Sequence, residues 1–407
     1  AYVDDKSPKA EFDERASIAF KKFLTSSARL RFPDEKAPQI SIILIFYNQA
    51  HLSLLCLQSI LQYADTPYQL IIIDNCSSDG TDQLLDRIEN ADIERNQENL
   101  GFVRAVNQAA ELATGKTILL LNNDALLEKQ TLSNALACIE ADRGIGAVGA
   151  KIKLLDGRLQ EAGSIIFSDG ACLGYGRGQP ADNPEFMFQR DVDYCSGAFL
   201  LFRRETFTDL GGFDEDFAPA YYEESDFCIR LREQGLRIVY NPAVQITHYE
   251  FASSGGLSGA LSLQAAHREI LCSKHENFLS KQFPNDPANY LRARTSNTHP
   301  NVLVIDDRVP HPSLGVGYPR CSTFLHELSK LKLNISFYPL LYPEDSWDEI
   351  YTTLSKNIEV ILNSGRDGLR SFLNQRSDFY QFIVVSRVHN MEFFNHVLSS
   401  NPGLAGN

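Results

Sequence analysis

The sequence of 407 residues lacks the features that mark membrane-spanning and disulfide-stapled proteins. No apolar run approaches the length of about 18 residues that a membrane-spanning helix needs, and we see no signal peptide. Eight cysteines are spread along the chain without a CxxC pair, which is typical of thiols in a reducing compartment. We therefore expect a cytoplasmic protein. Because the chain begins at Ala1 without Met and stops abruptly at Asn407, we also expect a piece of a longer protein.

Basic residues are also scarce, with 38 Lys and Arg against 52 Asp and Glu and a net charge of −14. A broad nucleic-acid-binding surface needs clustered Lys and Arg, so nucleic acid is not expected as a partner. Apolar residues make up 43% of the chain and charged residues 22%, which are ordinary values for globular proteins. This length and composition predict two or three domains with sizeable cores.

Uniformly apolar stretches alternate with amphipathic ones between residues 40 and 122. The segments "ISIILIF", "QLIIID" and "TILLLN" are predicted strands, and helical periodicity fills the residues between them. Strands that are apolar on both faces are typical of a parallel sheet covered by helices. We therefore predict an α/β fold with a doubly wound, mostly parallel sheet. One helix is predicted over "GTDQLLDRIENA", and one closing helix over "LQAAHREILCSKHENFLSKQF".

Composition divides the chain into three regions. Residues 1–38 are a polar extension with one predicted amphipathic helix, which ends before Pro33 and Pro38. Residues 39–295 hold the main α/β domain, and the polar stretch "PNDPANYLRARTSNTHP", with three prolines, marks its end. A fresh strand–helix alternation opens at "NVLVIDD" and predicts a second, Rossmann-like α/β domain over residues 296–407.

Carboxylates gather where predicted strands end or helices begin. Asp74 ends one strand, Asp124 follows another in "ILLLNNDALL", and Glu223, Glu224 and Asp226 open a helix. Ligands of open α/β sheets bind beyond the carboxyl ends of the strands, so a metal and phosphate site is one interpretation. Taken alone, Asp74 is better explained as a turn residue, and the helix dipole accounts for Glu223 and Glu224 equally well.

Several well-known sites are excluded. The chain has no GxxxxGK[ST] and no GxSxG. The match "GIGAVG" precedes a predicted strand instead of following one, so it is not a dinucleotide-binding fingerprint. Cys195 and Ser196 have no obvious base in the sequence, so a nucleophilic triad is unsupported.

Seven motifs occur in an order that resembles the inverting family 2 glycosyltransferases, which have the GT-A fold. They are "SIILIFYN", "IIIDNCSSDGT", "NLGFVRAVNQA", "ILLLNNDALL", "CSGAFLLFRRETFTDLGGFDEDF", "YYEESDFCIRLREQGLRIVYNP" and "THYEFASSG". The resemblance covers roughly residues 38–285. The segments "LQEAGSIIF", "YGRG" and "RDVDYCSGA" are similar to those of bacterial enzymes that build O-antigen and other surface polysaccharides.

The resemblance assigns residues to a nucleotide-sugar donor and a divalent cation, Mn²⁺ or Mg²⁺. Asn122-Asn123-Asp124 stands at the DxD-type motif, with Asp124 as metal ligand, and His248 matches the second ligand. The first acidic position of that motif is Asn122 here, which brings an amide oxygen without charge. The resemblance also assigns donor binding to five residues, which are Tyr47, Asp74, Arg104, Asn122 and Asn123. As a lone arginine, Arg104 fits a helix-surface role nearly as well.

The segment "EESD" matches the family's catalytic carboxylates, with Glu224 as general base and Glu223 and Asp226 in support. A positioned carboxylate can take the proton of an acceptor hydroxyl as that oxygen attacks the anomeric carbon. The family more often has Asp at the position of Glu224.

The resemblance implies an inverting, metal-dependent transferase that uses a UDP- or dTDP-sugar and a glycan or lipid-linked glycan acceptor, with peripheral association at the inner face of the membrane. Two alternatives stay open, an inactive nucleotide-sugar-binding module and a nucleotidyltransferase. The second would want a Gly-rich basic loop after the first strand, which "FYNQAHLS" lacks. Residues 300–407 resemble the first half of a family 4, GT-B type glycosyltransferase, which we interpret as a scaffold without chemistry of its own.

Overall fold

The computed structural model describes residues 7–250, 257–315, 317–341 and 345–400. The polar loop expected after His248, residues 251–256, lies outside these ranges. Within them, every helix is too short or too polar to span a bilayer. The chain divides into two compact units, one formed by Ala1–Ala181 and Asp191–Ser296 and the other by Asp182–Arg190 and Asn297–Asn407.

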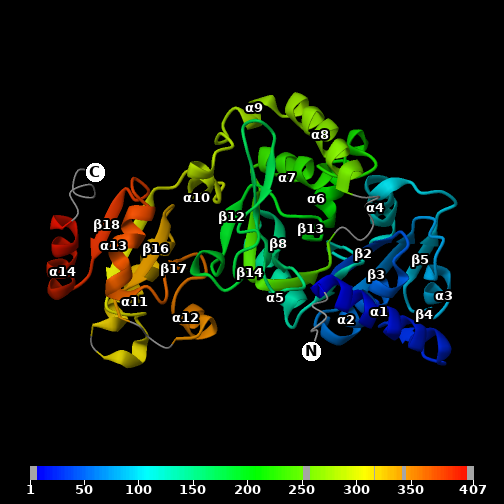
Figure 1. Cartoon of the computed structure of the whole chain (residues 1–407), viewed down its shortest axis with the longest axis horizontal. Coiled ribbons are helices and arrows are strands. Elements are labelled where there is room, and N and C mark those ends of the chain that lie inside the picture. Colours follow the sequence, from blue (N-terminus) through cyan, green and yellow to red (C-terminus); the bar gives the residue numbers. More distant parts are fainter. Residues whose placement is uncertain (1–6, 251–256, 316, 342–344, 401–407) are drawn as a thin grey trace, which may run out of the picture. The chain divides into compact units, whose positions relative to one another are not determined.

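A ten-stranded sheet forms the centre of the first unit (Figure 1). Its strands lie in the order β12 (Arg190–Val192), β14 (Arg237–His248), β8 (Ile145–Lys153), β13 (Phe199–Arg203), β6 (Thr117–Leu121), β2 (Ile40–Phe46), β3 (Tyr68–Asp74) and β5 (Asp92–Arg95), with β7 (Ala125–Leu127) paired to β14 and β9 (Leu159–Ala162) paired to β8. Parallel pairing joins β6, β2, β3 and β5, and also joins β8 to β14. Strand β13 runs antiparallel between β6 and β8. The prediction of a mostly parallel α/β sheet is confirmed.

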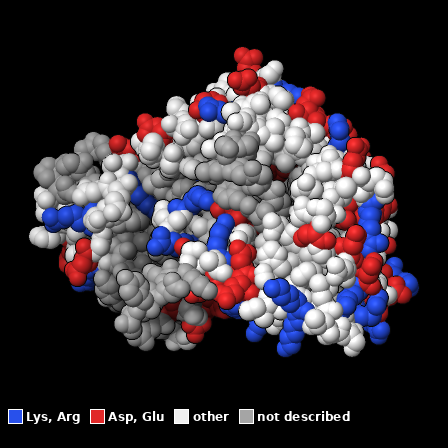
Figure 2. Space-filling view, turned by 45° about the vertical axis from the view of Figure 1, so that its right-hand side comes forward, with Lys and Arg blue, Asp and Glu red and all other residues white. Residues whose placement is uncertain are grey.

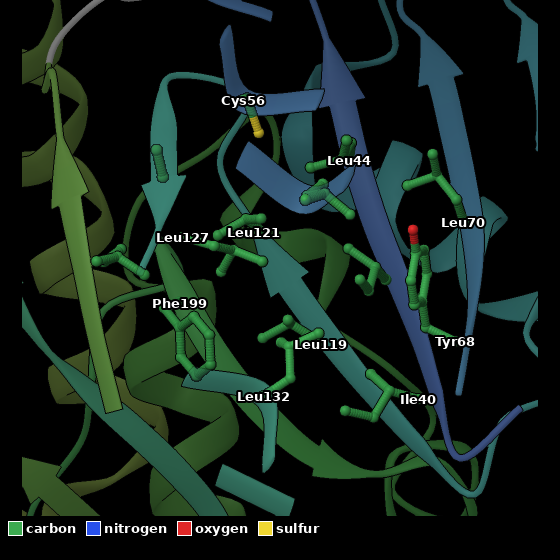
Figure 3. Packing of buried hydrophobic residues seen from close by; sticks show 14 of the residues in the cluster. Ile40, Leu44, Cys56, Tyr68, Leu70, Leu119, Leu121, Leu127, Leu132 and Phe199 are labelled. Carbon is green, nitrogen blue, oxygen red and sulfur yellow. The ribbon is translucent and has the colours of Figure 1, made fainter. Parts of the chain in front are cut away.

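Both faces of this sheet are buried. Strand β6 shows why its sequence is apolar throughout: Leu119 and Leu121 pack with residues of α2 (Ala50–Tyr63) and α5 (Thr131–Ala141) on one face (Figure 3). Ile118 and Leu120 alternate with them and are equally buried, because successive side chains of a strand point to opposite faces. The remaining helices of the unit are α1 (Pro8–Thr25), α3 (Thr81–Leu85), α4 (Gly101–Leu112), α6 (Arg204–Asp209), α7 (Glu223–Glu233), α8 (Leu257–Lys274), α9 (Glu276–Leu279) and α10 (Tyr290–Ala293).

Two helix predictions were wrong in extent. The helix expected over residues 80–91 ends at Leu85, because the following residues form β4 (Ile88–Glu89) and pair with β1 (Leu30–Arg31). The closing helix is interrupted at His275, whose backbone leaves the helical region between α8 and α9. In both places a tertiary contact outweighs local helix propensity.

The second unit holds a four-stranded parallel sheet. Its strands lie in the order β17 (Glu359–Val360), β16 (Asn334–Pro339), β15 (Asn301–Asp306) and β18 (Phe382–Val385), and its main helices are α11 (Tyr318–Ser329), α12 (Trp347–Thr353), α13 (Gly365–Gln375) and α14 (Val388–Ser399). Residues 182–190 belong to this unit, where the Gln189 N–H donates to the carbonyl of Lys356 at 2.7 Å.

Charged side chains are mixed on the surface. On the face shown in Figure 2, Lys and Arg side chains lie among Asp and Glu side chains. Ion pairs at the surface include Arg31–Glu89 and Arg95–Asp86, each at 2.7 Å. Pairs of this kind are weak in water, so they add little to the stability of the fold.

Candidate functional site

Two of the expected donor-binding residues lie at neighbouring strand ends. Tyr47 directly follows β2, and Asp74 ends β3, whose register aligns it with Phe46. Tyr47 is 36% exposed, whereas Asp74 is buried and accepts a hydrogen bond from the Ser77 N–H at 3.2 Å. Asp74 therefore does shape a turn, and the aromatic ring of Tyr47, at the neighbouring strand end, is partly exposed to solvent.

The turn after β6 brings Asp124 against His248. Because β7 pairs with the end of β14, His248 is aligned with Ala125. His248 Nε2 lies 2.9 Å from Asp124 Oδ1 and 3.2 Å from Asn122 Nδ2. On the other side of the ring, Nδ1 lies 2.8 Å from Gln160 Oε1 on β9, an oxygen that can only accept. Gln160 therefore fixes the ring so that Nε2 points to Asp124.

Burial and charge act in opposite directions on His248. Burial lowers the pKa of His248, but attraction to the Asp124 carboxylate, together with their hydrogen bond, outweighs burial and leaves the pKa raised. Both side chains are only 6% exposed. The pair is thus an enclosed acid–imidazole contact at the edge of the sheet.

The donor set of this pair fits a divalent cation. Two ligand atoms bound at right angles and about 2.1 Å from an octahedral ion lie about 3 Å apart, close to the 2.9 Å between Asp124 Oδ1 and His248 Nε2. Rotating the Asn122 amide would bring its oxygen to the same side. Among the described residues, no group of three or more His, Cys, Asp or Glu side chains is arranged to hold a metal. Further ligands would have to come from phosphate oxygens and water, as is common for Mg²⁺.

Two expected donor-binding residues are engaged elsewhere. The Asn123 side chain is buried and donates to Ser53 Oγ on α2 at 2.9 Å. Arg104 on α4 donates to Glu215 Oε2 at 2.9 Å, and both of these side chains are more than half exposed. These contacts give Asn123 a part in packing and Arg104 a surface ion pair.

Glu161, on β9, was missed by the sequence analysis. Its Oε1 accepts the Ser196 N–H and its Oε2 accepts the Ser164 hydroxyl, both at 3.0 Å. Burial raises the pKa of Glu161 to about 7, although these hydrogen bonds lower it, and the negative charge of Glu224 raises it further. The only signal in the sequence was the motif "LQEAGSIIF", which also carries Gln160.

Glu223 and Glu224 occupy the first turn of α7. Burial raises the pKa of both, and the charge of Glu224 adds to the rise for Glu223. Each has an enclosed Oε2 that lacks a hydrogen-bond partner in the described structure. Glu224 is the one that interacts electrostatically with Glu161, which in turn interacts with His248. Glu161 therefore interacts electrostatically both with Glu224 on α7 and with His248 at the end of β14.

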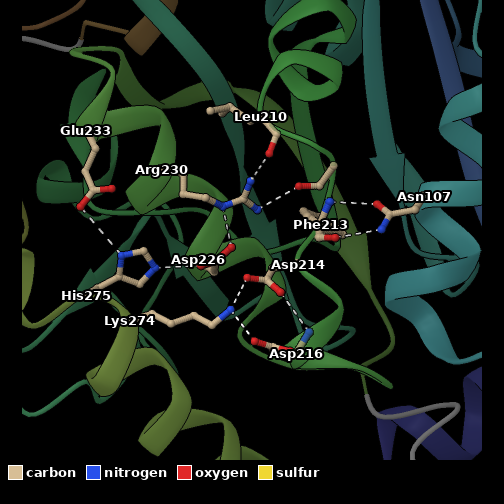
Figure 4. Close-up of polar contacts among 11 residues, drawn as sticks. Asn107, Leu210, Phe213, Asp214, Asp216, Asp226, Arg230, Glu233, Lys274 and His275 are labelled. Carbon is tan, nitrogen blue, oxygen red and sulfur yellow. Dashed lines mark hydrogen bonds and ion pairs between the residues drawn. The ribbon is translucent and has the colours of Figure 1, made fainter.

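Asp226 does not reach this group of carboxylates through any described hydrogen bond. Its Oδ2 accepts from Arg230 Nε and its Oδ1 from His275 Nε2, both at 2.8 Å, and the side chain is 1% exposed (Figure 4). Arg230 also donates to the carbonyls of Leu210 and Gly212, each at 2.9 Å. Asp226 therefore ties the first turn of α7 to the chain on both sides of it.

Comparisons with known proteins bear on these residues. The family described as "Glycosyl transferase family 2" matches residues 41–211. An O-antigen biosynthesis protein of Myxococcus xanthus is 28% identical over 55% of this chain and 18% of its own. An N-acetylglucosaminyl-diphospho-decaprenol L-rhamnosyltransferase of Mycobacterium tuberculosis is 28% identical over 53% of this chain and 78% of its own.

A solved mannosyltransferase of Pyrobaculum calidifontis, in complex with GDP-Man and Mn²⁺, is 20% identical, with a TM-score of 0.41 over 65% of this chain and 70% of its own. The chain spans about a fifth of the Myxococcus relative and 26% of another curated relative, from Sinorhizobium fredii. The matched residues run from β2 to the end of α6 and include Tyr47, Asp74 and Asp124. The chain therefore contains a glycosyltransferase family 2 domain, at residues 41–211.

Proposed function

We propose that this protein transfers a sugar from a UDP- or dTDP-sugar to a hydroxyl of a glycan or lipid-linked glycan, with inversion at the anomeric carbon. The observation that carries the proposal is the enclosed Asp124–His248 pair, with 2.9 Å between Oδ1 and Nε2, in a chain whose residues 41–211 match family 2. A divalent cation, Mn²⁺ or Mg²⁺, bound by these two residues would neutralise charge on the leaving diphosphate.

Glu224 is the proposed general base, with Glu223 beside it. It takes the proton of the acceptor hydroxyl while that oxygen bonds to the anomeric carbon and the bond from carbon to diphosphate oxygen breaks. The electron pair of the broken bond leaves with the nucleoside diphosphate. A carboxylate whose pKa is raised by burial holds a proton more tightly, which favours this transfer. Tyr47 and Asp74 are proposed to contact the nucleotide, because they lie together at neighbouring strand ends.

The acceptor proposal draws on the relatives. The Mycobacterium enzyme is named for transfer to a lipid diphosphate, and the Myxococcus protein for O-antigen biosynthesis. We accordingly propose a role in surface polysaccharide synthesis, in the cytoplasm at the inner face of the membrane. We further propose that the active site lies in the first unit and that the second unit, which resembles half of a GT-B enzyme, is a scaffold.

A donor screen tests this function. The protein is incubated with UDP- and dTDP-sugars, with Mn²⁺ or with EDTA, and free nucleoside diphosphate is measured after addition of a lipid-linked glycan acceptor. The proposal expects metal-dependent release with at least one donor. Binding without release would favour an inactive binding module, and release of pyrophosphate from a nucleoside triphosphate and a sugar phosphate would favour a nucleotidyltransferase.

A further inference from the structure

Arg177 lies on a tight turn that runs beside the candidate site. Backbone hydrogen bonds of 2.8 Å from the Gly178 N–H to Leu159 O and 2.9 Å from the Ala162 N–H to Tyr175 O place this turn along β9, the strand of Glu161. The glycines on either side of Arg177 have φ of 82° and 79°, a conformation that glycine adopts readily. The local sequence "GRG" therefore sets the direction in which this arginine leaves the backbone.

Within the described residues, the guanidinium of Arg177 forms hydrogen bonds only with Glu250. The contact is bidentate: Arg177 Nη1 lies 2.8 Å from Glu250 Oε1, and Nη2 lies 2.7 Å from Oε2. Glu250 follows His248 by two residues, and its charge interacts with that histidine. The arginine side chain is 47% exposed, whereas the glutamate is 12% exposed. Glu250, two residues after His248, thus holds an accessible guanidinium, whose charge also interacts with Glu161.

Glu250 is anchored from its far side by α1. Lys9 Nζ donates to the Glu250 carbonyl at 2.7 Å, and the hydroxyl of the preceding Tyr249 donates to Asp13 Oδ2 at 2.6 Å. The Tyr249 N–H donates to the carbonyl of Asp124 at 3.0 Å. The glutamate is therefore the fixed member of the pair, and the exposed arginine is the member that can move.

A diphosphate entering this site meets several carboxylates, so it needs cationic partners. The arginine fork binds a phosphate through the same two parallel hydrogen bonds with which it binds a carboxylate. We propose that Arg177 binds the diphosphate of a substrate, and that Glu250 holds the guanidinium ready until phosphate oxygens replace its own. This inference rests on the proposed function, because it assumes a diphosphate substrate at Asp124 and His248. The diphosphate belongs either to the nucleotide donor or to a lipid-linked acceptor.

The competing interpretation is a structural ion pair that only joins two segments. In that case, removing either partner has the same effect. If Arg177 binds diphosphate, the two removals have opposite effects, because Glu250→Gln releases the arginine from a competing carboxylate while Arg177→Gln removes the ligand-binding group. A matched control is Arg95→Gln, since Arg95 is 44% exposed and pairs with Asp86 at 2.7 Å.

The test is calorimetric titration of wild type and the variants with inorganic pyrophosphate in EDTA, so that no metal takes part. Arg177→Gln should weaken binding about 10- to 100-fold, the effect of losing a hydrogen bond to a charged group. Glu250→Gln should bind at least as tightly as wild type, Arg177→Lys should lie in between, and Arg95→Gln should match wild type. Circular dichroism spectra verify folding. Unchanged binding in Arg177→Gln, or equal weakening in Arg177→Gln and Glu250→Gln, would overturn the inference.

Two further titrations separate the sources of the diphosphate and separate this inference from the proposed function. Weaker binding of UDP or dTDP to Arg177→Gln assigns Arg177 to the donor, and weaker binding of a short prenyl diphosphate assigns it to the acceptor. If the wild-type protein transfers sugar and Arg177→Gln matches its affinity for every diphosphate, the inference is refuted and the proposed function stands. A wild-type protein that binds no nucleotide, yet loses pyrophosphate binding with Arg177, refutes the function instead.

Discussion

His275 Nε2 lies 2.8 Å from Asp226 Oδ1, with both side chains buried. This contact joins the first turn of α7, which also carries Glu224, to the residue at which the closing helix breaks. Arg230 completes the arrangement on the other oxygen of Asp226. The position of the proposed base therefore depends on a buried hydrogen-bond network that lies outside the group formed by Glu161, Glu223 and Glu224 (Figure 4).

Asp226→Asn should destabilise the protein by about 3–5 kcal/mol, because it leaves the largely buried guanidinium of Arg230 without its countercharge. Urea denaturation followed by circular dichroism measures this change. The control is Asp216→Asn, which removes an exposed carboxylate 2.6 Å from Lys274 Nζ and should cost less than about 1 kcal/mol. Equal losses in the two variants would contradict the account.

Glu161 should make stability fall as pH rises. Its pKa is raised from the ordinary 4.5 to about 7, so the folded state binds the proton more tightly than the unfolded state does. The contribution is present in full below pH 4.5 and is lost as pH rises to about 7, with an upper size of about 3 kcal/mol. Glu161→Gln cannot lose a proton, so its stability relative to wild type should increase across this range.

Urea denaturation at several pH values between 4.5 and 8 tests the Glu161 prediction, with the exposed Glu140→Gln as control. A stability difference between wild type and Glu161→Gln that stays constant with pH would show that Glu161 titrates as it does in the unfolded chain.

Asp124→Ala should abolish the metal-dependent part of nucleotide binding. The substitution removes the carboxylate that lies 2.9 Å from His248 Nε2, and with it one of two protein ligands proposed for the cation. Titration of UDP or dTDP into wild type should show tighter binding with Mn²⁺ than with EDTA, whereas the variant should bind equally in both. Asp86→Asn, at an exposed carboxylate, serves as the control. Wild-type affinity that ignores EDTA would reject the metal proposal.

Much of the fold was predictable because its signals are local. Strand β6 is apolar at every position since both of its faces are buried, and the mostly parallel sheet follows from such strands alternating with helices. The end of α3 was not predictable from residues 80–91. There, Ile88 and Glu89 pair with Leu30 and Arg31, a contact with residues more than fifty positions away.

The candidate site divides along the same line. Asp124 and His248 could be singled out because each stands in a motif. The sequence could not reveal that Gln160 orients the His248 ring or that Glu161 interacts with both Glu224 and His248. These relations depend on how β8, β9 and β14 pair. Nor does any local pattern show that Asp226 forms a hydrogen bond with His275, a residue 49 positions later.

The most direct test of the central claim is the turnover of Glu224→Gln, because the substitution keeps the shape of the side chain and removes its basicity. Donor binding should stay near the wild-type value while sugar transfer falls about 10²- to 10⁴-fold, the range expected for loss of a general base. Glu223→Gln, one residue away, is the matched comparison and should retain more activity. Full transfer by Glu224→Gln, or inactivity of Glu223→Gln alone, would contradict the assignment of Glu224 as the base.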